Sequence, residues 1–297
     1  MVLPLGLVTP VVSMNPRVAS DWERTATPDD LVEIARAADR LGFHHLTCSE
    51  HVAVPEGATS STGARRGTRY YDPAVTLAWL AAATTRVRLA THVLVAGHHH
   101  PLQVAKTYGT LDVLSAGRVV LGLGVGSLRE EFDLLGVPFD DRGVRTDDFV
   151  RALRAAWGEA EPAYEGPVYR FGGMTVDPCA TTRAPTVWIG GRTPRSLRRA
   201  LELGDGWVPF GLADDDLARI TGGARDSEAW ARRRRPFDVV LPAEGLDPVG
   251  DPRRTVERLG QLVDLGATMV NVRLVHGSLA HLLDQLEALA PLAARQP

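Results

Sequence analysis

Cysteine is scarce in this 297-residue chain, which has only Cys48 and Cys179. Two cysteines so far apart form neither a disulfide framework nor a cysteine-based metal site, and their scarcity predicts a cytoplasmic protein. Long apolar runs are also lacking, since the longest, such as Ala74–Ala83, are too short to cross a bilayer. We therefore expect no metal site and no membrane partner.

A basic excess is missing as well. The chain has 33 Lys and Arg residues against 36 Asp and Glu residues, a formal net charge of -3. Because nucleic-acid-binding proteins usually carry a clear positive surplus, we expect no nucleic-acid partner. The apolar start of the chain, residues 1–8, lacks a basic region and a small-residue cleavage site, so it is expected to form a first strand rather than a signal peptide.

Short β-rich apolar runs alternate with helical patterns, which predicts βα units and a parallel sheet. Eight strands and eight helices in a chain somewhat longer than about 250 residues predict a (β/α)8 TIM barrel, with residues 1–297 as a single domain. A doubly wound open sheet is the alternative, but Thr9-Pro10-Val11 is not the G-x-G-x-x-G turn that it would carry. The expected strands are Leu3–Val8, His45–Ser49, Val87–Val95, Arg118–Val125, Thr186–Ile189, Gly206–Phe210, Phe237–Leu241 and Thr268–Leu274.

Two segments depart from this alternation. Residues 159–184 contain turn residues and short strand-like pieces, and we expect an insertion after the fourth strand that lies over one mouth of the barrel. The run Arg232–Arg235 precedes the seventh strand, at the end of the barrel that serves stability. It is therefore expected to be a solvated patch.

Barrel enzymes carry their chemistry on the loops that follow the strands. Glu50 and His51 follow the second strand, and a carboxylate beside an imidazole suits proton transfer near neutral pH, or else a hydrogen-bonded pair that anchors the loop. His98, His99 and His100 follow the third strand. Adjacent residues point in different directions, so these histidines predict a surface loop rather than a metal site.

Glycines mark the ends of two further strands. The fourth strand runs into Gly122, Gly124 and Gly126, which leave room for a flat or anionic group, or serve tight packing of the barrel. The fifth runs into Gly190–Thr193 and then directly into a helix. Backbone N–H groups and the helix dipole favour an anion there, with an ordinary βα turn as the alternative. Together they predict a phosphorylated, planar cofactor.

In order and spacing, segments over most of the chain resemble the bacterial luciferase-like monooxygenase superfamily. Within it, the chain is most similar to the branch of coenzyme F420-dependent oxidoreductases. The matching segments are Ala37–Phe43, Ser49–His51, Thr110–Val119, Gly122–Ser127, Arg129–Phe132, Leu135–Phe139, Trp188–Gly191 and Leu203–Trp207.

The resemblance implies a TIM barrel in which Glu50 and His51 lie beside the reactive ring, with His51 as acid or base and Glu50 as the group that orients it. It also implies a bulge at His92-Val93, often with a non-proline cis peptide, behind the ring. The phosphate would lie at Gly190–Thr193. The cofactor-binding residues expected on this basis are Thr91, His92, Val93, Gly124, Gly126, Gly190, Gly191, Arg192 and Thr193.

The chain departs from its relatives at two places. Many of them have Gly or Ser at the position of His92, and several F420 enzymes have a proton-donating carboxylate at the position of Ser127. Glu130 and Glu131 are expected instead to open the next helix, where acidic residues suit the dipole. In the loop after the second strand, Arg65, Arg66 and Arg69 are candidates for an anionic cofactor tail or for a solvated loop.

The leading hypothesis is a coenzyme F420-dependent oxidoreductase that moves a hydride between the deazaflavin and a small organic substrate. The second is an FMN-dependent monooxygenase that uses O2 and a partner reductase. A non-catalytic flavin-binding protein on the same barrel is the third. Trp22, in the first βα loop, is a candidate wall of the substrate site or a surface packing residue. The resemblance further implies a homodimer.

Overall fold

The computed structural model describes residues 3–14, 16, 19–59 and 67–292. Its main sheet is a closed barrel of parallel strands, in which the pairing of β3 with β5 completes the ring. This confirms the predicted TIM barrel. The strands are β1 (Leu5–Leu7), β2 (His45–Cys48), β3 (Arg88–Thr91) continued by β4 (Leu94–Val95), β5 (Val119–Gly124), β8 (Thr186–Gly190), β9 (Gly206–Val208), β10 (Asp238–Leu246) and β11 (Met269–Leu274).

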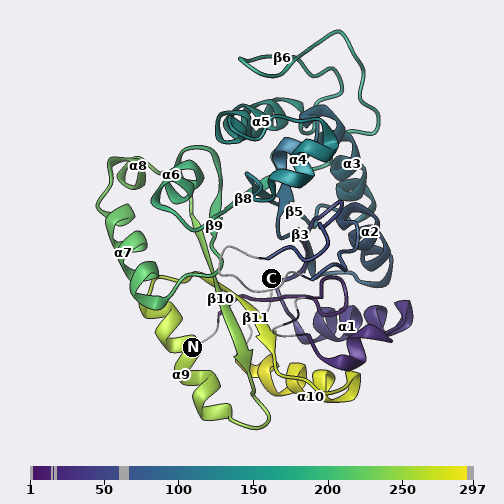
Figure 1. The fold of residues 1–297 in the computed structure, drawn as a ribbon, viewed down its shortest axis with the longest axis vertical. Helices are drawn as coiled ribbons and strands as arrows, with labels where there is room; N and C mark the ends of the chain where they lie inside the picture. Colours follow the sequence, from purple (N-terminus) through teal and green to yellow (C-terminus); the bar gives the residue numbers. More distant parts are fainter. Residues whose placement is uncertain (1–2, 15, 17–18, 60–66, 293–297) are drawn as a thin grey trace.

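Helices surround the strands as an outer layer (Figure 1). Five of the ten helices in the described residues begin with a polar cap followed by proline, as at Thr27-Pro28, Asp72-Pro73 and Asp251-Pro252. Proline fits the first turn because that position needs no N–H donor. None of the helices among the described residues is long and apolar enough to span a membrane. The helices are α1 (Pro28–Leu41), α2 (Pro73–Ala83), α3 (Pro101–Leu114), α4 (Arg129–Leu135), α5 (Arg142–Ala156), α6 (Pro194–Leu203), α7 (Asp214–Arg225), α8 (Glu228–Ala231), α9 (Pro252–Asp264) and α10 (Leu279–Leu289), with the 3-10 turns η1 (Asp21–Arg24), η2 (Ala96–His98) and η3 (Ala290–Leu292).

Most expected strands are shorter by one or two residues at an end, and two differ by more. The expected strand Val87–Val95 is split into β3 and β4, because the peptide between His92 and Val93 is cis and interrupts the ladder. Strand β10 continues past Pro242 to Leu246, with an irregular register against β11 between Ala243 and Leu246. Proline lacks only its own N–H, so one missing donor does not end a strand.

The segment 159–184 contains the short antiparallel hairpin of β6 (Tyr164–Glu165) and β7 (Arg170–Phe171), which projects beyond α5 in Figure 1. Asp148 of α5 accepts hydrogen bonds from the Tyr164 hydroxyl and from the backbone of Val168. Asp112 of α3 likewise accepts from Thr181 and Thr182. The insertion therefore packs on the outer helices, and the expectation that it covers a mouth of the barrel is wrong.

The core has an inner and an outer part. A small cluster inside the barrel takes one side chain from each of six strands, and Val93 packs against it from the His92-Val93 bulge. A larger cluster fills the space between strands and helices. Alternate residues of a strand point to opposite faces, so each of these six strands contributes side chains to the inner and to the outer cluster. The inner cluster consists of Ala90, Val120, Trp188, Val208, Val240 and Met269.

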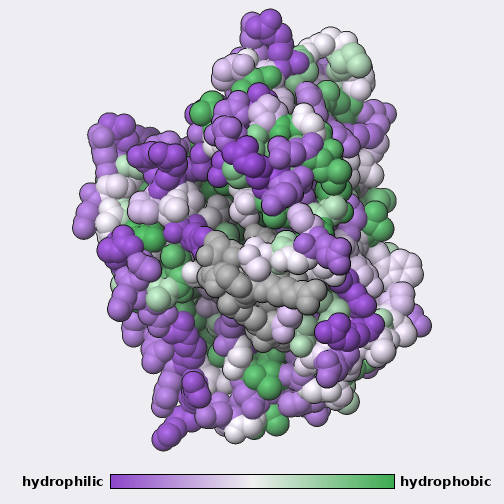
Figure 2. Space-filling view, viewed as in Figure 1, coloured by the Kyte–Doolittle hydropathy of each residue, from purple (hydrophilic) through white to green (hydrophobic). Residues whose placement is uncertain are grey.

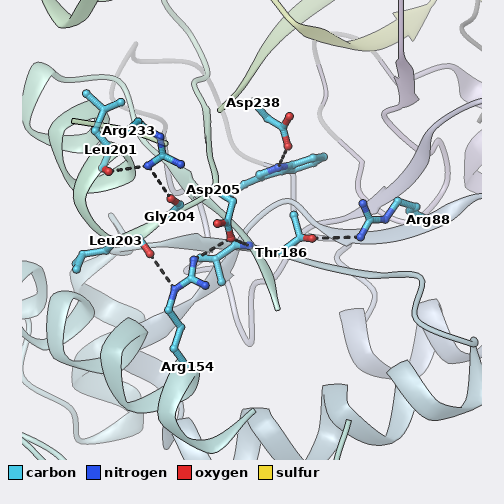
Figure 3. A network of polar contacts seen from close by, with 11 residues as sticks. Arg88, Arg154, Thr186, Leu201, Leu203, Gly204, Asp205, Arg233 and Asp238 are labelled. Carbon is cyan, nitrogen blue, oxygen red and sulfur yellow. Dashed lines mark hydrogen bonds and ion pairs between the residues drawn. The ribbon is translucent and has the colours of Figure 1, made fainter. Parts of the chain in front are cut away.

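A polar network ties the strands together at their amino ends (Figure 3). Arg88 of β3 donates to Thr186 of β8 at 3.2 Å, and the Trp188 indole donates to Asp238 of β10 at 2.9 Å. Arg233, from the basic run, donates to the carbonyl of Leu201 at the end of α6. Three of the four arginines in that run are exposed, as the sequence predicts, whereas Arg233 docks on the helix end.

The outer surface is mixed in polarity. On the face drawn in Figure 2, hydrophilic side chains gather over the α7 and α9 side, with apolar residues scattered among them. This agrees with helices that bury one face against the barrel and leave the other in water.

Candidate functional site

Glu50, directly after β2, lies at the carboxyl end of the barrel and is buried. One carboxylate oxygen accepts the Val95 N–H at 2.6 Å, and the other lies 2.6 Å from Nε2 of His99. Glu50 thus holds β4 and the following turn in place. The expected pairing of Glu50 with His51 is wrong, because both oxygens face the β4 side.

His51 is paired with a different carboxylate. Its Nδ1 lies 2.7 Å from Glu131 of α4, and its ring stands edge-on to Tyr70 with the centroids 4.4 Å apart. A carboxylate only accepts hydrogen bonds, so this contact assigns a proton to Nδ1, and Nε2 is the ring nitrogen that Glu131 does not engage. The His51 side chain keeps 16% of its surface exposed, so it remains accessible to solvent and ligands.

Glu131 is buried, and its second oxygen accepts the N–H groups of Val52 at 2.7 Å and Ala53 at 3.3 Å. Burial raises the pKa of this carboxyl, but the hydrogen bond and charge of His51 and the two backbone donors outweigh it, so the pKa lies below its usual value. Glu131 is therefore an ionised group that orients the ring of His51 and fixes the loop after β2. From the sequence, Glu131 is expected only to open the next helix, because its contact with His51 joins residues 80 positions apart and leaves no local signal.

The His92-Val93 bulge is present, and its non-proline cis peptide confirms the expectation from the resemblance. The bulge brings the Val93 side chain against two strand-end glycines. A methyl group added at Gly124 would lie 2.6 Å from Val93, and one at Gly190 would lie 2.8 Å from it. Only glycine tolerates such an approach, so Val93, Gly124 and Gly190 form one contiguous apolar floor at the end of the barrel.

Two other residues predicted to bind the cofactor, Thr91 and Gly126, have contacts that stabilise the barrel wall. Thr91 is fully buried, and its hydroxyl donates to the Gly122 carbonyl at 2.8 Å, which joins β3 to β5 where the ladder is broken. Gly126 has a φ of 78°, and a methyl group there would collide with Phe132 at 2.5 Å. The Thr91 side chain therefore joins two strands in the barrel wall, and the lack of a side chain at Gly126 leaves room for Phe132.

His92 ends a chain of polar side chains inside the barrel. Its Nε2 lies 3.3 Å from the Asn271 amide nitrogen, and the Asn271 oxygen lies 2.6 Å from Nε2 of His45. His44 continues the chain, 3.0 Å from His45. Burial and the Arg273 charge lower the pKa of His92 to about 4, so the ring is neutral near pH 7. It accepts a hydrogen bond from Asn271 and does not supply a positive charge.

Gly190–Thr193 lies where β8 enters α6, as predicted. Thr193 caps the helix, since its hydroxyl accepts the Ser196 N–H at 3.2 Å. The Arg192 guanidinium lies 5.9 Å from the centre of the exposed Phe210 ring, and it is partly accessible. A ten-residue helix that presents its N-terminus beside an arginine suits a phosphate group.

The remaining candidates have other surroundings. The Trp22 indole donates to His276 at 3.0 Å, beside the loop after β11. Arg69 donates to the Glu23 carbonyl at 2.8 Å and so fastens η1. Arg65 and Arg66 lie outside the described residues.

The three consecutive histidines have three separate roles. His98 lies edge-on to Phe132, His99 contacts Glu50, and the exposed His100 caps α3. Of the three, only His100 fits the predicted surface loop, since His98 and His99 are partly buried. Among the residues that the structure describes, no group of three His, Cys, Asp or Glu side chains could hold a metal ion.

The fold and these strand ends define a TIM barrel with its candidate site at the carboxyl end of the strands. A model of the family described as luciferase-like monooxygenases matches residues 6–246. The chain belongs to this family. Among solved structures of similar fold is an F420-dependent secondary alcohol dehydrogenase, with a TM-score of 0.76, 15% identity, and coverage of 99% of this chain and 100% of that one.

Similar proteins of known sequence fall into different groups. One is an uncharacterized protein of Mycobacterium bovis, 30% identical over 81% of this chain and 83% of its own. An F420-dependent glucose-6-phosphate dehydrogenase of Intrasporangium calvum is 29% identical over 85% and 72%. The oxygenase component of a flavin-dependent trigonelline monooxygenase of Acinetobacter baylyi is 26% identical over 76% and 61%. These relatives are oxidoreductases or monooxygenases where an activity is named, which supports an enzyme.

Proposed function

We propose that this protein is a coenzyme F420-dependent oxidoreductase that transfers a hydride between the deazaflavin and a small organic substrate. The observation that carries the proposal is the floor of Val93, Gly124 and Gly190, which adjoins the start of α6 through Gly190. A flat ring on this floor would have its phosphate side at the helix N-terminus. The similarity to the F420-dependent glucose-6-phosphate dehydrogenase supports this choice of cofactor.

When bound, the cofactor supplies the hydride chemistry. Residues of this chain place it and manage protons. Val93 supports one face of the ring, and Arg192 with the α6 N-terminus neutralises the phosphate charge. His51 exchanges a proton at Nε2, and Glu131 holds the ring of His51 in place through Nδ1.

The cofactor is tested by titrating the purified protein separately with F420 and FMN, following the fluorescence of each. Saturable binding of F420, at least about tenfold tighter than that of FMN, is the expected result. Tight binding of FMN without F420 binding would refute the F420 assignment. It would favour the second candidate, a flavin-dependent monooxygenase, which the similarity to the trigonelline monooxygenase supports.

A third outcome concerns catalysis. A protein that binds a cofactor but turns over no substrate, over a panel of alcohols, aldehydes and activated alkenes, would correspond to a non-catalytic flavin-binding protein. The His51–Glu131 pair argues against this, because a buried, ionised carboxylate has been positioned on a solvent-accessible imidazole.

Arg192→Gln is expected to weaken binding of a phosphorylated cofactor about tenfold, because one charge-assisted contact to phosphate contributes roughly 1.5–3 kcal/mol. The measurement compares FMN with riboflavin, and F420 with its dephosphorylated form. Only the phosphorylated member of each pair should lose affinity. Arg195→Gln, a neighbouring exposed position, serves as the matched control. Equal losses for riboflavin and FMN would place the phosphate elsewhere.

A further inference from the structure

Arg273 lies on β11 and points toward the inside of the barrel near its carboxyl end. The direction follows from the alternation along the strand: Val270, Val272 and Leu274 belong to the outer core, whereas Met269 belongs to the inner cluster. Asn271, with the same parity as Arg273, bonds to side chains inside the barrel. Arg273 therefore stands one strand repeat, about 7 Å, above Asn271. It is partly buried.

The Arg273 guanidinium has no hydrogen bond and no ion pair within 4 Å to any residue that the structure describes. This is unusual, because a sequestered guanidinium carries five donors that need acceptors. Buried Arg118 shows the ordinary solution, since it donates to carbonyls of Ser115, Val87 and Ala81 at 2.8–3.0 Å. All five N–H donors of Arg273 thus lack an acceptor among the described residues, although the side chain is partly shielded from water.

The acidic groups around Arg273 do not take up these donors. Burial lowers the pKa of Arg273, while the charges of Glu244 and Glu23 and the nearby Tyr70 raise it, so the side chain stays a cation. Glu23 is occupied, as its two oxygens accept the N–H groups of Val11 at 2.7 Å and Ser20 at 2.8 Å. Glu244, on the next strand, is exposed and lies beyond ion-pair distance.

We propose that Arg273 binds an anionic group of the substrate, a carboxylate or comparable oxyanion, and that this protein acts on small anionic molecules. The inference rests on the proposed function, because it assigns the substrate side of the same site. A planar guanidinium meets a carboxylate with two parallel hydrogen bonds, which gives orientation as well as affinity.

The position of Arg273 separates this anion from the cofactor phosphate. Strand β8 leads into Gly190–Thr193, and around the barrel it is separated from β11 by β10 and β9 on one side and by β1, β2, β3 and β5 on the other. Arg273 is instead next to the bulge, since Asn271 two residues earlier contacts His92 at 3.3 Å. Anion and reactive ring would therefore meet at Val93. Trp22 lies on this side as well, through its bond to His276 in the loop after β11.

The test uses two probes of equal shape and different charge, benzoate and benzamide, titrated into the full-length protein by calorimetry. Wild-type protein should bind benzoate at least about tenfold more tightly than benzamide, and Arg273→Gln should bind the two equally. Arg273→Lys keeps the charge but not the paired donors, and should retain part of the preference. Arg192→Gln should retain all of it. Glu244→Gln, which removes a competing carboxylate, should retain or increase it.

Three outcomes would overturn the proposal: no benzoate preference in the wild type, a preference that survives Arg273→Gln, or one that disappears in Arg192→Gln. Titration of F420 and FMN into Arg273→Gln is the separate readout for the cofactor, and its affinity should equal that of the wild type. A selective loss of cofactor affinity there would assign Arg273 to the cofactor instead. If neither cofactor binds the wild type, the proposed function fails while the benzoate preference stands.

Discussion

Replacing His51 with alanine is expected to lower the turnover number by about 10²–10⁴-fold, the range typical of a lost general acid or base. The effect should fall mainly on kcat, because His51 is proposed to move a proton and not to hold the cofactor. The measurement is steady-state turnover with F420 and the fastest substrate found in the panel. His281→Gln, which changes a histidine on α10 away from the pair, should keep wild-type turnover.

Glu131→Gln tests the orienting role of the carboxylate. We expect a smaller loss of turnover than in His51→Ala. The imidazole remains in this variant, but the carboxylate that holds its ring at 2.7 Å is replaced by a neutral amide. Full turnover in His51→Ala would remove the acid–base role, and wild-type turnover in Glu131→Gln would remove the orienting role.

Acidification should destabilise the protein strongly, because His44, His45 and His92 are buried in neutral form. Burial, with the charge of Arg88 or Arg273, lowers the pKa of His44 and His92 to about 4, and burial and the neighbouring His44 lower that of His45 well below its usual value. The unfolded chain takes up protons on His44 and His92 from about pH 6.5, whereas the folded chain does so only near pH 4. Between these values the unfolded state binds more protons, so the free energy of unfolding falls as the pH falls.

The size of the effect follows from about 1.4 kcal/mol per pKa unit, which amounts to at most about 3.5 kcal/mol each for His44 and His92. Urea unfolding at several pH values between 7 and 4.5 measures it. The slope of stability against pH should decrease by close to one proton in His92→Asn and stay unchanged in His281→Gln. Constant stability between pH 7 and 5 would show that these rings are not held neutral.

Much of the fold could be read from local pattern. The runs of apolar residues and the caps such as Thr27-Pro28 predicted the order of strands and helices, because both depend on neighbours in sequence. The position of the His92-Val93 bulge came from the family resemblance, and the structure has it there. The break of the third strand at that point and the extension of β10 past Pro242 were not predicted, since each depends on how the neighbouring strand runs.

The hydrogen-bond partners of the candidate site residues were not predicted. Glu50 and His51 are neighbours in sequence, yet their side chains turn to different elements: Glu50 to β4, and His51 to α4. The inward direction of Arg273 could have been predicted from the sequence pattern of its strand. In Met269–Leu274, polar Asn271 and Arg273 alternate with apolar residues, which for a barrel strand places the polar side chains inside.

The sequence by itself thus determined the TIM barrel and the glycines at the ends of its strands. Only the tertiary structure decided which carboxylate contacts His51, that Thr91 bonds to β5, and that Arg273 points into the barrel without an acceptor among the described residues. The physical reason is the separation along the sequence of the residues that interact. Strand and helix patterns arise from contacts a few residues apart, whereas hydrogen-bond partners such as His51 and Glu131, 80 residues apart, meet only when the barrel closes.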